Sequence, residues 1–191
     1  GRKTIEILEK SKLSINNLYL VASKNSAGKK ISFKSKDILV EELENYDFSK
    51  AEITFFAASS SIAKEWIPLV SKKTIVIDNS SYFRMKNDVP LVVPEVNSKD
   101  LNSHKNIIAN PNCSTIQMVL ALKPLHDKYK IRRVVVSTYQ AVSGAGKSAM
   151  DELVSQTKDY LNNKKIIPKN YTKQIAFNVI PHIDIFGDDG Y

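Results

Sequence analysis

The sequence contains almost no cysteine and little histidine. Cys113 is the only cysteine among 191 residues, and the histidines, His104, His126 and His182, lie far apart along the chain. A single cysteine excludes a disulfide within the chain, and we therefore expect a reducing, cytoplasmic setting. These four residues also give no ligand set for a structural zinc ion, so no metal site is expected.

Long apolar runs and clustered arginines are also lacking. No stretch approaches the roughly 20 apolar residues that a membrane-spanning helix requires, so no membrane partner is expected. The net charge of +8 comes mainly from lysines spread along the chain, and arginine is scarce. Nucleic-acid-binding proteins combine clustered basic residues with aromatic side chains, and no such cluster is found here. We interpret the charge as a solvated surface, with a non-catalytic basic binding or oligomerisation fragment as the alternative.

Segments rich in Val, Ile and Phe alternate with segments that have helical periodicity. Helices are expected at residues 2–12, 61–72, 114–129 and 148–161, and strands or short extended segments at 17–23, 51–59, 73–80, 90–96, 105–110, 132–142 and 175–186. The last helix carries an apolar stripe of Met150, Leu153, Val154, Thr157, Tyr160 and Leu161. Continuous apolar runs predict strands covered on both faces. Strands separated by helices predict an α/β fold with a doubly wound parallel sheet.

The two ends of the sequence do not fit a complete doubly wound domain. Such a domain normally opens on a strand, whereas Gly1 leads directly into a predicted helix. The last residues, "FGDDGY", end without a terminating element. We therefore expect a chain truncated at both ends, lacking a first strand and a larger C-terminal segment.

The single cysteine lies in the stretch "ANPNCSTIQM", residues 109–118, between a predicted strand and a predicted helix. Pro111 cannot extend a central strand, and Asn110 and Asn112 tolerate turn geometry. Cys113 is therefore expected in the first helical turn, where unpaired N–H groups stabilise a thiolate. Ligands of open α/β sheets bind at this end of the strands, which makes Cys113 a candidate nucleophile. The alternative is a buried cysteine that acts as a small hydrophobic residue.

Two further stretches are candidates for ligand contact. "QAVSGAGKS", residues 140–148, has small residues between a predicted strand and a predicted helix, where backbone can approach a ligand closely. It lacks the first glycine of a nucleotide phosphate loop because position 141 is alanine, and a plain glycine loop is the alternative. In "IDNSSYFRMKNDVP", residues 77–90, the guanidinium of Arg84 suits recognition of a carboxylate or phosphate. The alternative for Arg84 is a surface ion pair.

These motifs, taken together and in this order, resemble aspartate-semialdehyde dehydrogenase. The matching stretches are "NPNCSTIQ", "STYQAVSGAGK", "DNSSYFRM", "VPLVVPEVN", "SAGKK" and "AFNVIPHID". The resemblance implies a Rossmann-type NADP-binding domain at residues 1–112. The start of an α+β catalytic and dimerisation domain would follow at residues 113–191. It also implies a cytoplasmic homodimer.

The resemblance implies NADPH-dependent reductive dephosphorylation of L-4-aspartyl phosphate to L-aspartate 4-semialdehyde. This reaction belongs to the biosynthesis of lysine and diaminopimelate, threonine and methionine. Cys113 then corresponds to the nucleophile that forms a thioester, Gln140 to the residue that orients the substrate, and Arg84 to the phosphate-binding arginine. Asn112 would shape the site beside the nucleophile, and the family's catalytic histidine would lie beyond Tyr191. The alternative enzyme, N-acetyl-γ-glutamyl-phosphate reductase, usually has "PGCY" where this sequence has "PNCST".

Contacts with the cofactor are also implied by the resemblance. Gly1 would be the last glycine of the dinucleotide fingerprint. Ser59 and Ser60 would contact the bound dinucleotide, and Ser143 and Gly144 would lie against the nicotinamide.

The expected contact with the 2′-phosphate of NADP departs from the family pattern. The family commonly has arginine followed by serine after the second strand, whereas this sequence has Asn25 and Ser26. Lys24 or Lys29 would supply the positive charge instead, with less directional hydrogen bonding than an arginine. NADP is still the cofactor that we expect.

Overall fold

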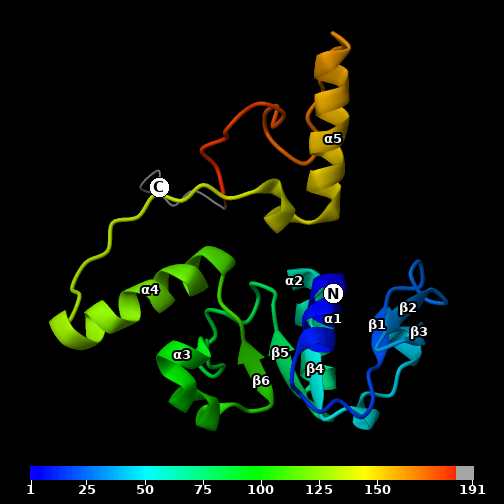
Figure 1. Cartoon of the computed structure of the whole chain (residues 1–191), viewed down its shortest axis with the longest axis vertical. Coiled ribbons are helices and arrows are strands. Elements are labelled where there is room, and N and C mark those ends of the chain that lie inside the picture. The colour runs from blue at the N-terminus through cyan, green and yellow to red at the C-terminus, as the bar shows by residue number, and fades with distance from the viewer. Residues whose placement is uncertain (184–191) are drawn as a thin grey trace. The chain divides into compact units, whose positions relative to one another are not determined.

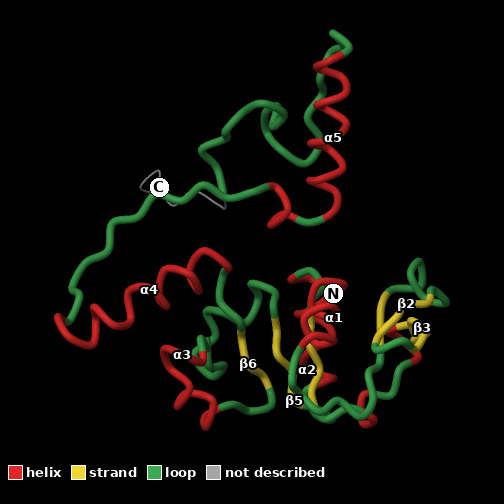
Figure 2. Tube along the Cα trace, in the orientation of Figure 1, coloured by secondary structure: helices red, strands yellow, loops and turns green. Residues whose placement is uncertain are grey.

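The computed structural model describes residues 1–183. The chain divides into two compact units, Gly1–Arg132 and Arg133–Tyr191. Figure 1 and Figure 2 show the helices of both units and the strands of the first unit. The α/β class is confirmed, and the predicted domain boundary at residues 112 and 113 stays a prediction.

The first unit contains all the described strands and four of the α helices. Its elements are α1 (Arg2–Lys10), β1 (Leu20–Ala22), β2 (Lys30–Phe33), β3 (Lys36–Glu42), η1 (Leu43–Asn45), η2 (Phe48–Lys50), β4 (Ile53–Phe56), α2 (Ser60–Val70), β5 (Ile75–Asp78), α3 (Pro94–Asn97), η3 (Ser98–Ser103), β6 (Ile107–Ala109) and α4 (Cys113–Tyr129). The described part of the second unit contains η4 (Val142–Ala145) and α5 (Lys147–Leu161).

Strands β4, β5 and β6 form a parallel sheet in that order. Phe56 lies opposite Asp78, and Asp78 lies opposite Ala109. This pairing confirms the predicted parallel arrangement of strands separated by helical segments. Because the strands are parallel, the residues that follow them meet at one edge of the sheet, where open α/β sheets bind ligands.

A second sheet contains a hairpin that the sequence analysis did not predict. Strand β1 pairs in parallel with β3, and β2 pairs with β3 antiparallel. The two-residue turn between β2 and β3 has positive φ at Lys34 (48°) and Ser35 (62°). Hairpins with such turns are usually signalled by Asn-Gly or Asp-Gly, and neither pair occurs here. The hairpin therefore lacked its usual sequence signal.

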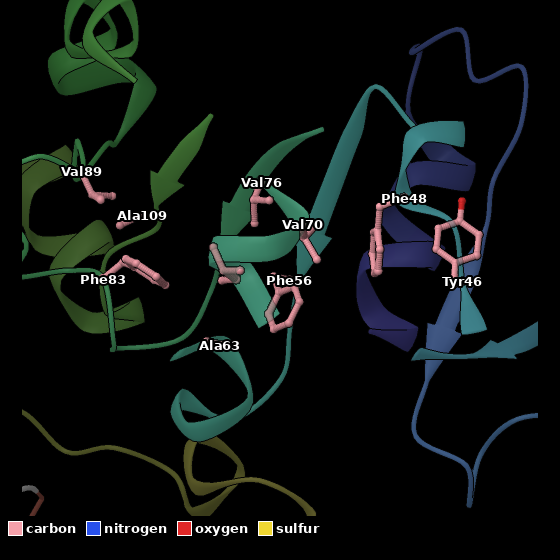
Figure 3. Packing of buried hydrophobic residues seen from close by; sticks show 10 residues of the cluster. Tyr46, Phe48, Phe56, Ala63, Val70, Val76, Phe83, Val89 and Ala109 are labelled. Atoms are coloured by element: carbon pink, nitrogen blue, oxygen red, sulfur yellow. The ribbon is translucent and has the colours of Figure 1, made fainter. Parts of the chain in front are cut away.

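Helix α2 packs on the parallel sheet through one face. Ala63, Ile67 and Val70 are at most 1% exposed and belong to the same buried cluster as Phe56 and Val76. A spacing of four and then three residues places these helix side chains on one face. Figure 3 shows this cluster at close range. The packing fixes the start of α2 near the carboxyl edge of the sheet.

The predicted strand at residues 132–142 is wrong. Residues 131–141 have no regular secondary structure, and Val134, Val135 and Val136 are exposed. A β-branched run favours extended backbone, but a strand also needs a neighbour that pairs with its N–H and C=O groups. None of the strand pairings among residues 1–183 includes this segment.

Two shorter extended segments also differ from expectation. In residues 90–96, Leu91 forms an isolated bridge to Ala109, and α3 then begins at Pro94, since proline is well tolerated at the start of a helix. In residues 175–186, the described part contains no strand, and the left-handed backbone of Phe177 (φ 56°) interrupts the extension. Residues 184–186 lie outside the described residues.

Helix α5 confirms the predicted helix but buries a different face. Val154 and Tyr160 of the apolar stripe are exposed, whereas Glu152 and Gln156 are buried. Both buried side chains accept hydrogen bonds from backbone N–H groups of the segment that follows the helix. A polar contact that depends on the later course of the chain thus overrides the apolar periodicity.

None of the helices within residues 1–183 has the length and apolar character needed to cross a membrane. The same residues contain no cluster of three or more His, Cys, Asp or Glu side chains that could hold a metal ion.

Candidate active site

The candidate active site lies at the carboxyl edge of the β4-β5-β6 sheet. Asn110 follows β6 and donates its backbone N–H to the carbonyl oxygen of Asp78 (2.8 Å), so the chain leaves the sheet only after this residue. Pro111 and Asn112 form the turn, and α4 begins at Cys113. The strand–turn–helix elbow that the sequence predicts around the cysteine is confirmed.

Cys113 occupies the first position of α4 and is exposed. The alternative of a buried, purely structural cysteine is therefore wrong. The first N–H groups of a helix have no partners within the helix, and their partial positive charge favours an anion. The start of α4 is therefore a position where an anionic group is favoured.

The side chain of Asn112 caps α4 directly before the cysteine. Its Oδ1 accepts hydrogen bonds from the backbone N–H (3.0 Å) and the hydroxyl (2.7 Å) of Ser114. The thiol of Cys113 donates to the same oxygen, with 3.7 Å between Sγ and Oδ1. Sequence reasoning missed Ser114, although the strong preference of asparagine for the position before a helix was an available signal.

Arg84 is tied to the elbow that carries the cysteine. Its Nε donates to the carbonyl oxygen of Asn110 (3.0 Å), and its Nη2 donates to that of Asn79 (3.2 Å). The two asparagine side chains are joined as well, because Asn110 Nδ2 donates to Asn79 Oδ1 (2.6 Å). Within residues 1–183, Arg84 forms no salt bridge, and its other N–H groups have no hydrogen-bond partner. The guanidinium thus has donors left over for an anion.

Ser59 and Ser60 follow β4, at the same edge of the sheet. Ser59 caps α2 by accepting a hydrogen bond from the backbone N–H of Ile62 (3.5 Å). The hydroxyl of Ser60 lies 2.9 Å from that of Ser81, in the loop that follows β5. The ends of β4 and β5 are therefore joined at the sheet edge that also carries the elbow.

The other cofactor candidates of the first unit lie on α1 and on the turn after β1. Gly1 directly precedes α1. Lys24, Asn25 and Ser26 form the turn, in which the N–H of Ser26 donates to the carbonyl of Ser23 (2.8 Å), and Lys24 and Asn25 are exposed. No hydrogen bond or ion pair within the described residues links Gly1 to this turn. Their assignment to the cofactor stays a prediction.

The remaining candidates belong to the second unit. Gln140 is exposed and accepts a hydrogen bond from the Thr138 hydroxyl (3.3 Å). Ser143 and Gly144 are exposed on η4. Gly146 follows with φ 93°, a conformation that glycine adopts without strain. The stretch is thus a turn that leads into α5, and its contact with a ligand stays a prediction.

Comparisons with known proteins agree with this architecture. The family model "Semialdehyde dehydrogenase, NAD binding domain" matches residues 1–104, and "Semialdehyde dehydrogenase, dimerisation domain" matches residues 122–191. The sequence is 51% identical over 197 residues to "Aspartate-semialdehyde dehydrogenase" from Aquifex aeolicus, covering 100% of this chain and 58% of that protein.

Solved structures give the same result. The chain is similar to aspartate semialdehyde dehydrogenase II from Vibrio cholerae, solved in complex with ASA, with a TM-score of 0.95 and 44% identity, over 100% of this chain and 58% of that one. It is also similar to aspartate semialdehyde dehydrogenase with NADP from Candida albicans, with a TM-score of 0.56 and 29% identity, over 69% of this chain and 44% of that one.

The chain spans 58% of the length of the Aquifex and Vibrio proteins. The NAD-binding model alone matches more than half of the chain, and the matched residues include every strand except β6. The chain belongs to the semialdehyde dehydrogenase family.

Proposed function

We propose that the protein catalyses the NADPH-dependent reductive dephosphorylation of L-4-aspartyl phosphate to L-aspartate 4-semialdehyde. One observation carries the proposal. Cys113 is exposed at the first position of α4, at the carboxyl edge of a parallel sheet. It lies in a chain that is similar over its whole length to proteins named aspartate-semialdehyde dehydrogenase.

The chemistry follows from the position of the sulfur. The thiolate of Cys113 attacks the acyl carbon of the substrate, the C–S bond forms, and the bond to the phosphate oxygen breaks, so that phosphate leaves. The N-terminus of α4 stabilises both the attacking thiolate and the negative charge on the acyl oxygen. A bound NADPH would supply a hydride to the thioester carbon, where the C–S bond breaks, so that the aldehyde forms and Cys113 leaves as the thiolate.

Three other side chains have proposed roles in the reaction. Arg84 binds the phosphate group through the guanidinium N–H groups that the elbow leaves unused. Asn112 shapes the site beside the sulfur, with its amide held at the start of α4. Gln140 orients the substrate, as the family resemblance implies.

The residues of the first unit also fit a dinucleotide. Gly1 at the start of α1 and Ser59 at the start of α2 place N–H groups where phosphate groups bind favourably. Lys24, in the exposed turn after β1, supplies a cation for a 2′-phosphate, next to Asn25 and Ser26. We propose NADP on these grounds, and the similarity to a structure solved with NADP supports it. Ser60 contributes a hydroxyl to the same site. The family resemblance assigns Ser143 and Gly144 to the loop against the nicotinamide.

The cellular setting follows from the same proposal. The enzyme acts in the cytoplasm as a homodimer, and the match to a dimerisation domain supports the dimer. Its product serves the biosynthesis of lysine and diaminopimelate, threonine and methionine.

The proposal is tested on the protein as its gene encodes it, by phosphate-dependent reduction of NADP⁺ in the presence of aspartate semialdehyde. We expect turnover in the wild type and its loss in Cys113→Ser, because an alcohol ionises far less readily than a thiol and forms no thioester. Binding of NADPH, measured by fluorescence, should persist in the variant and shows that the fold is intact. Turnover at the wild-type rate in Cys113→Ser would exclude the covalent mechanism.

A further inference from the structure

The amide of Asn112 has only one orientation that the first turn of α4 can accept. Its Oδ1 lies 3.0 Å from the backbone nitrogen of Ser114, which can only donate a hydrogen bond. If the amide were flipped, its NH₂ group would face this N–H, and two donors would oppose each other. The carbonyl oxygen of Asn112 therefore faces into the turn.

The opposite end of this amide, Nδ2, points away from the turn. Within residues 1–183, no side chain or backbone group accepts a hydrogen bond from Asn112 Nδ2. The amide is directly beside the sulfur, since Oδ1 lies 3.7 Å from Sγ of Cys113. Two N–H donors are thus held next to the nucleophile, where a bound substrate oxygen can reach them.

The ionisation of Cys113 weakens this arrangement. In the thiol form, Asn112 Oδ1 receives three hydrogen bonds, from the Ser114 N–H, the Ser114 hydroxyl and the Cys113 thiol. Loss of the thiol proton removes one of them and leaves a negative sulfur beside a carbonyl oxygen, which repel each other. The two groups of Ser114 must then hold the amide alone, and the hydroxyl makes the shorter bond (2.7 Å).

We propose that Ser114 is a positioning residue that keeps the NH₂ group of Asn112 directed at the substrate oxygen while Cys113 is a thiolate. This inference rests on the proposed function, because it assigns a task within the same acyl-transfer step. Its hydroxyl opposes rotation of the amide at the moment when the sulfur favours that rotation. Substrate binding itself does not require the hydroxyl.

The test uses Ser114→Ala, which removes the hydroxyl and keeps the backbone N–H. We expect kcat to fall about ten-fold with little change in KM, less than the 10²- to 10³-fold lost when an oxyanion donor is deleted outright. Ser114→Thr restores a hydroxyl and should recover most of kcat. The control is Thr115→Val in the same helical turn, because the Thr115 side chain has no hydrogen bond within the described residues. It should behave as wild type.

A double-mutant cycle with Asn112→Ala separates positioning from a general effect on the helix. If Ser114 acts through Asn112, Ser114→Ala should cause no further loss of kcat in the Asn112→Ala background. Additive losses, or an unchanged kcat in Ser114→Ala, overturn the proposal for Ser114 alone when the wild type shows Cys113-dependent turnover. A wild type without such turnover overturns the proposed function, and the role of Ser114 with it.

Discussion

At the scale of single residues, Arg84 meets two demands with one guanidinium. Two of its donors hold the carbonyl groups of Asn79 and Asn110, and the others are unpaired within the described residues. The first pair fixes the elbow before Cys113, and the second set is the one that we propose for phosphate binding. A planar fork meets both demands at once, whereas a lysine ammonium is a single point charge.

Replacement of Arg84 should therefore affect both binding and turnover. In Arg84→Ala we expect KM for phosphate to rise about 10- to 100-fold, the equivalent of roughly 1.5–3 kcal/mol for hydrogen bonds to a charged group. We expect kcat to fall as well, because the elbow loses two hydrogen bonds. Steady-state kinetics in the phosphate-dependent direction measures both constants.

Arg84→Lys separates the effect on phosphate binding from the effect on the elbow. The lysine keeps the charge and should recover part of KM, but it cannot bridge the carbonyls of Asn79 and Asn110, so kcat should stay low. The matched control is Lys86→Ala, an exposed cation in the same loop, which should leave both constants unchanged. An unchanged KM for phosphate in Arg84→Ala would remove the phosphate-binding role.

The residue scale also shows what local sequence can predict. The position of Cys113 followed from its immediate neighbours, since Pro111 ends a strand and asparagine favours the start of a helix. The contact between Arg84 and Asn110 could not be predicted in this way, because Asn110 lies 26 residues further along the chain. The two meet only because β5 and β6 are neighbours in the sheet.

At the scale of elements, α5 depends on a buried carboxylate. Glu152 is 7% exposed and accepts hydrogen bonds from the backbone N–H groups of Lys169 (2.8 Å) and Asn170 (2.6 Å), the side chain of Asn170 (2.6 Å) and that of Gln156 (2.7 Å). Burial raises the pKa of Glu152, but these hydrogen bonds to the charged form outweigh it, and the net pKa lies below the ordinary 4.5. The carboxylate therefore ties the helix to the segment after it.

A variant without this charge should be less stable than the wild type at pH values above 4.5, the ordinary pKa of the carboxyl. Glu152→Gln presents NH₂ to donors, so we expect a loss of about 1–3 kcal/mol in the free energy of unfolding at pH 7. Because folding lowers the pKa of Glu152, its contribution is present above pH 4.5 and is lost as the pH falls through the folded-state value. The difference between wild type and variant should narrow below pH 4.5.

Urea unfolding across this pH range measures both effects. Asp151→Asn is the control on the same helix, because Asp151 makes only an exposed ion pair with Lys147 and should cost at most about 1 kcal/mol. Equal stability of Glu152→Gln and wild type at pH 7 would contradict the role of the carboxylate.

Helices and strands could be predicted where the local sequence has a clear apolar pattern or characteristic turn residues. The parallel strands and the longer helices have clear apolar patterns, and each lies within a few residues of its expected position. The β2-β3 hairpin was missed because Lys and Ser, at positions 34 and 35, are not the residue types typical of a turn with positive φ. The face of α5 was also unpredictable, because Glu152 accepts hydrogen bonds from Lys169 and Asn170, which follow the helix in the chain.

At the scale of the whole molecule, the described part of the second unit exposes large apolar side chains. Val135 is 81% exposed, Phe177 68% and Val179 67%. Exposed apolar residues at this density mark surfaces that are covered by other protein. The same part of the sequence matches the dimerisation domain of the family. The domain match supports the homodimer that we propose.

We therefore expect the protein, as its gene encodes it, to sediment with twice its subunit mass at micromolar concentration. An interface built from apolar groups gains from the removal of surface from water, a gain that salt does not screen. The dimer should therefore persist in 0.5 M NaCl, where charges are screened over roughly four ångströms. Dissociation by salt would instead indicate that charges such as the exposed lysines hold the subunits together, and a monomer at low salt would exclude the dimer.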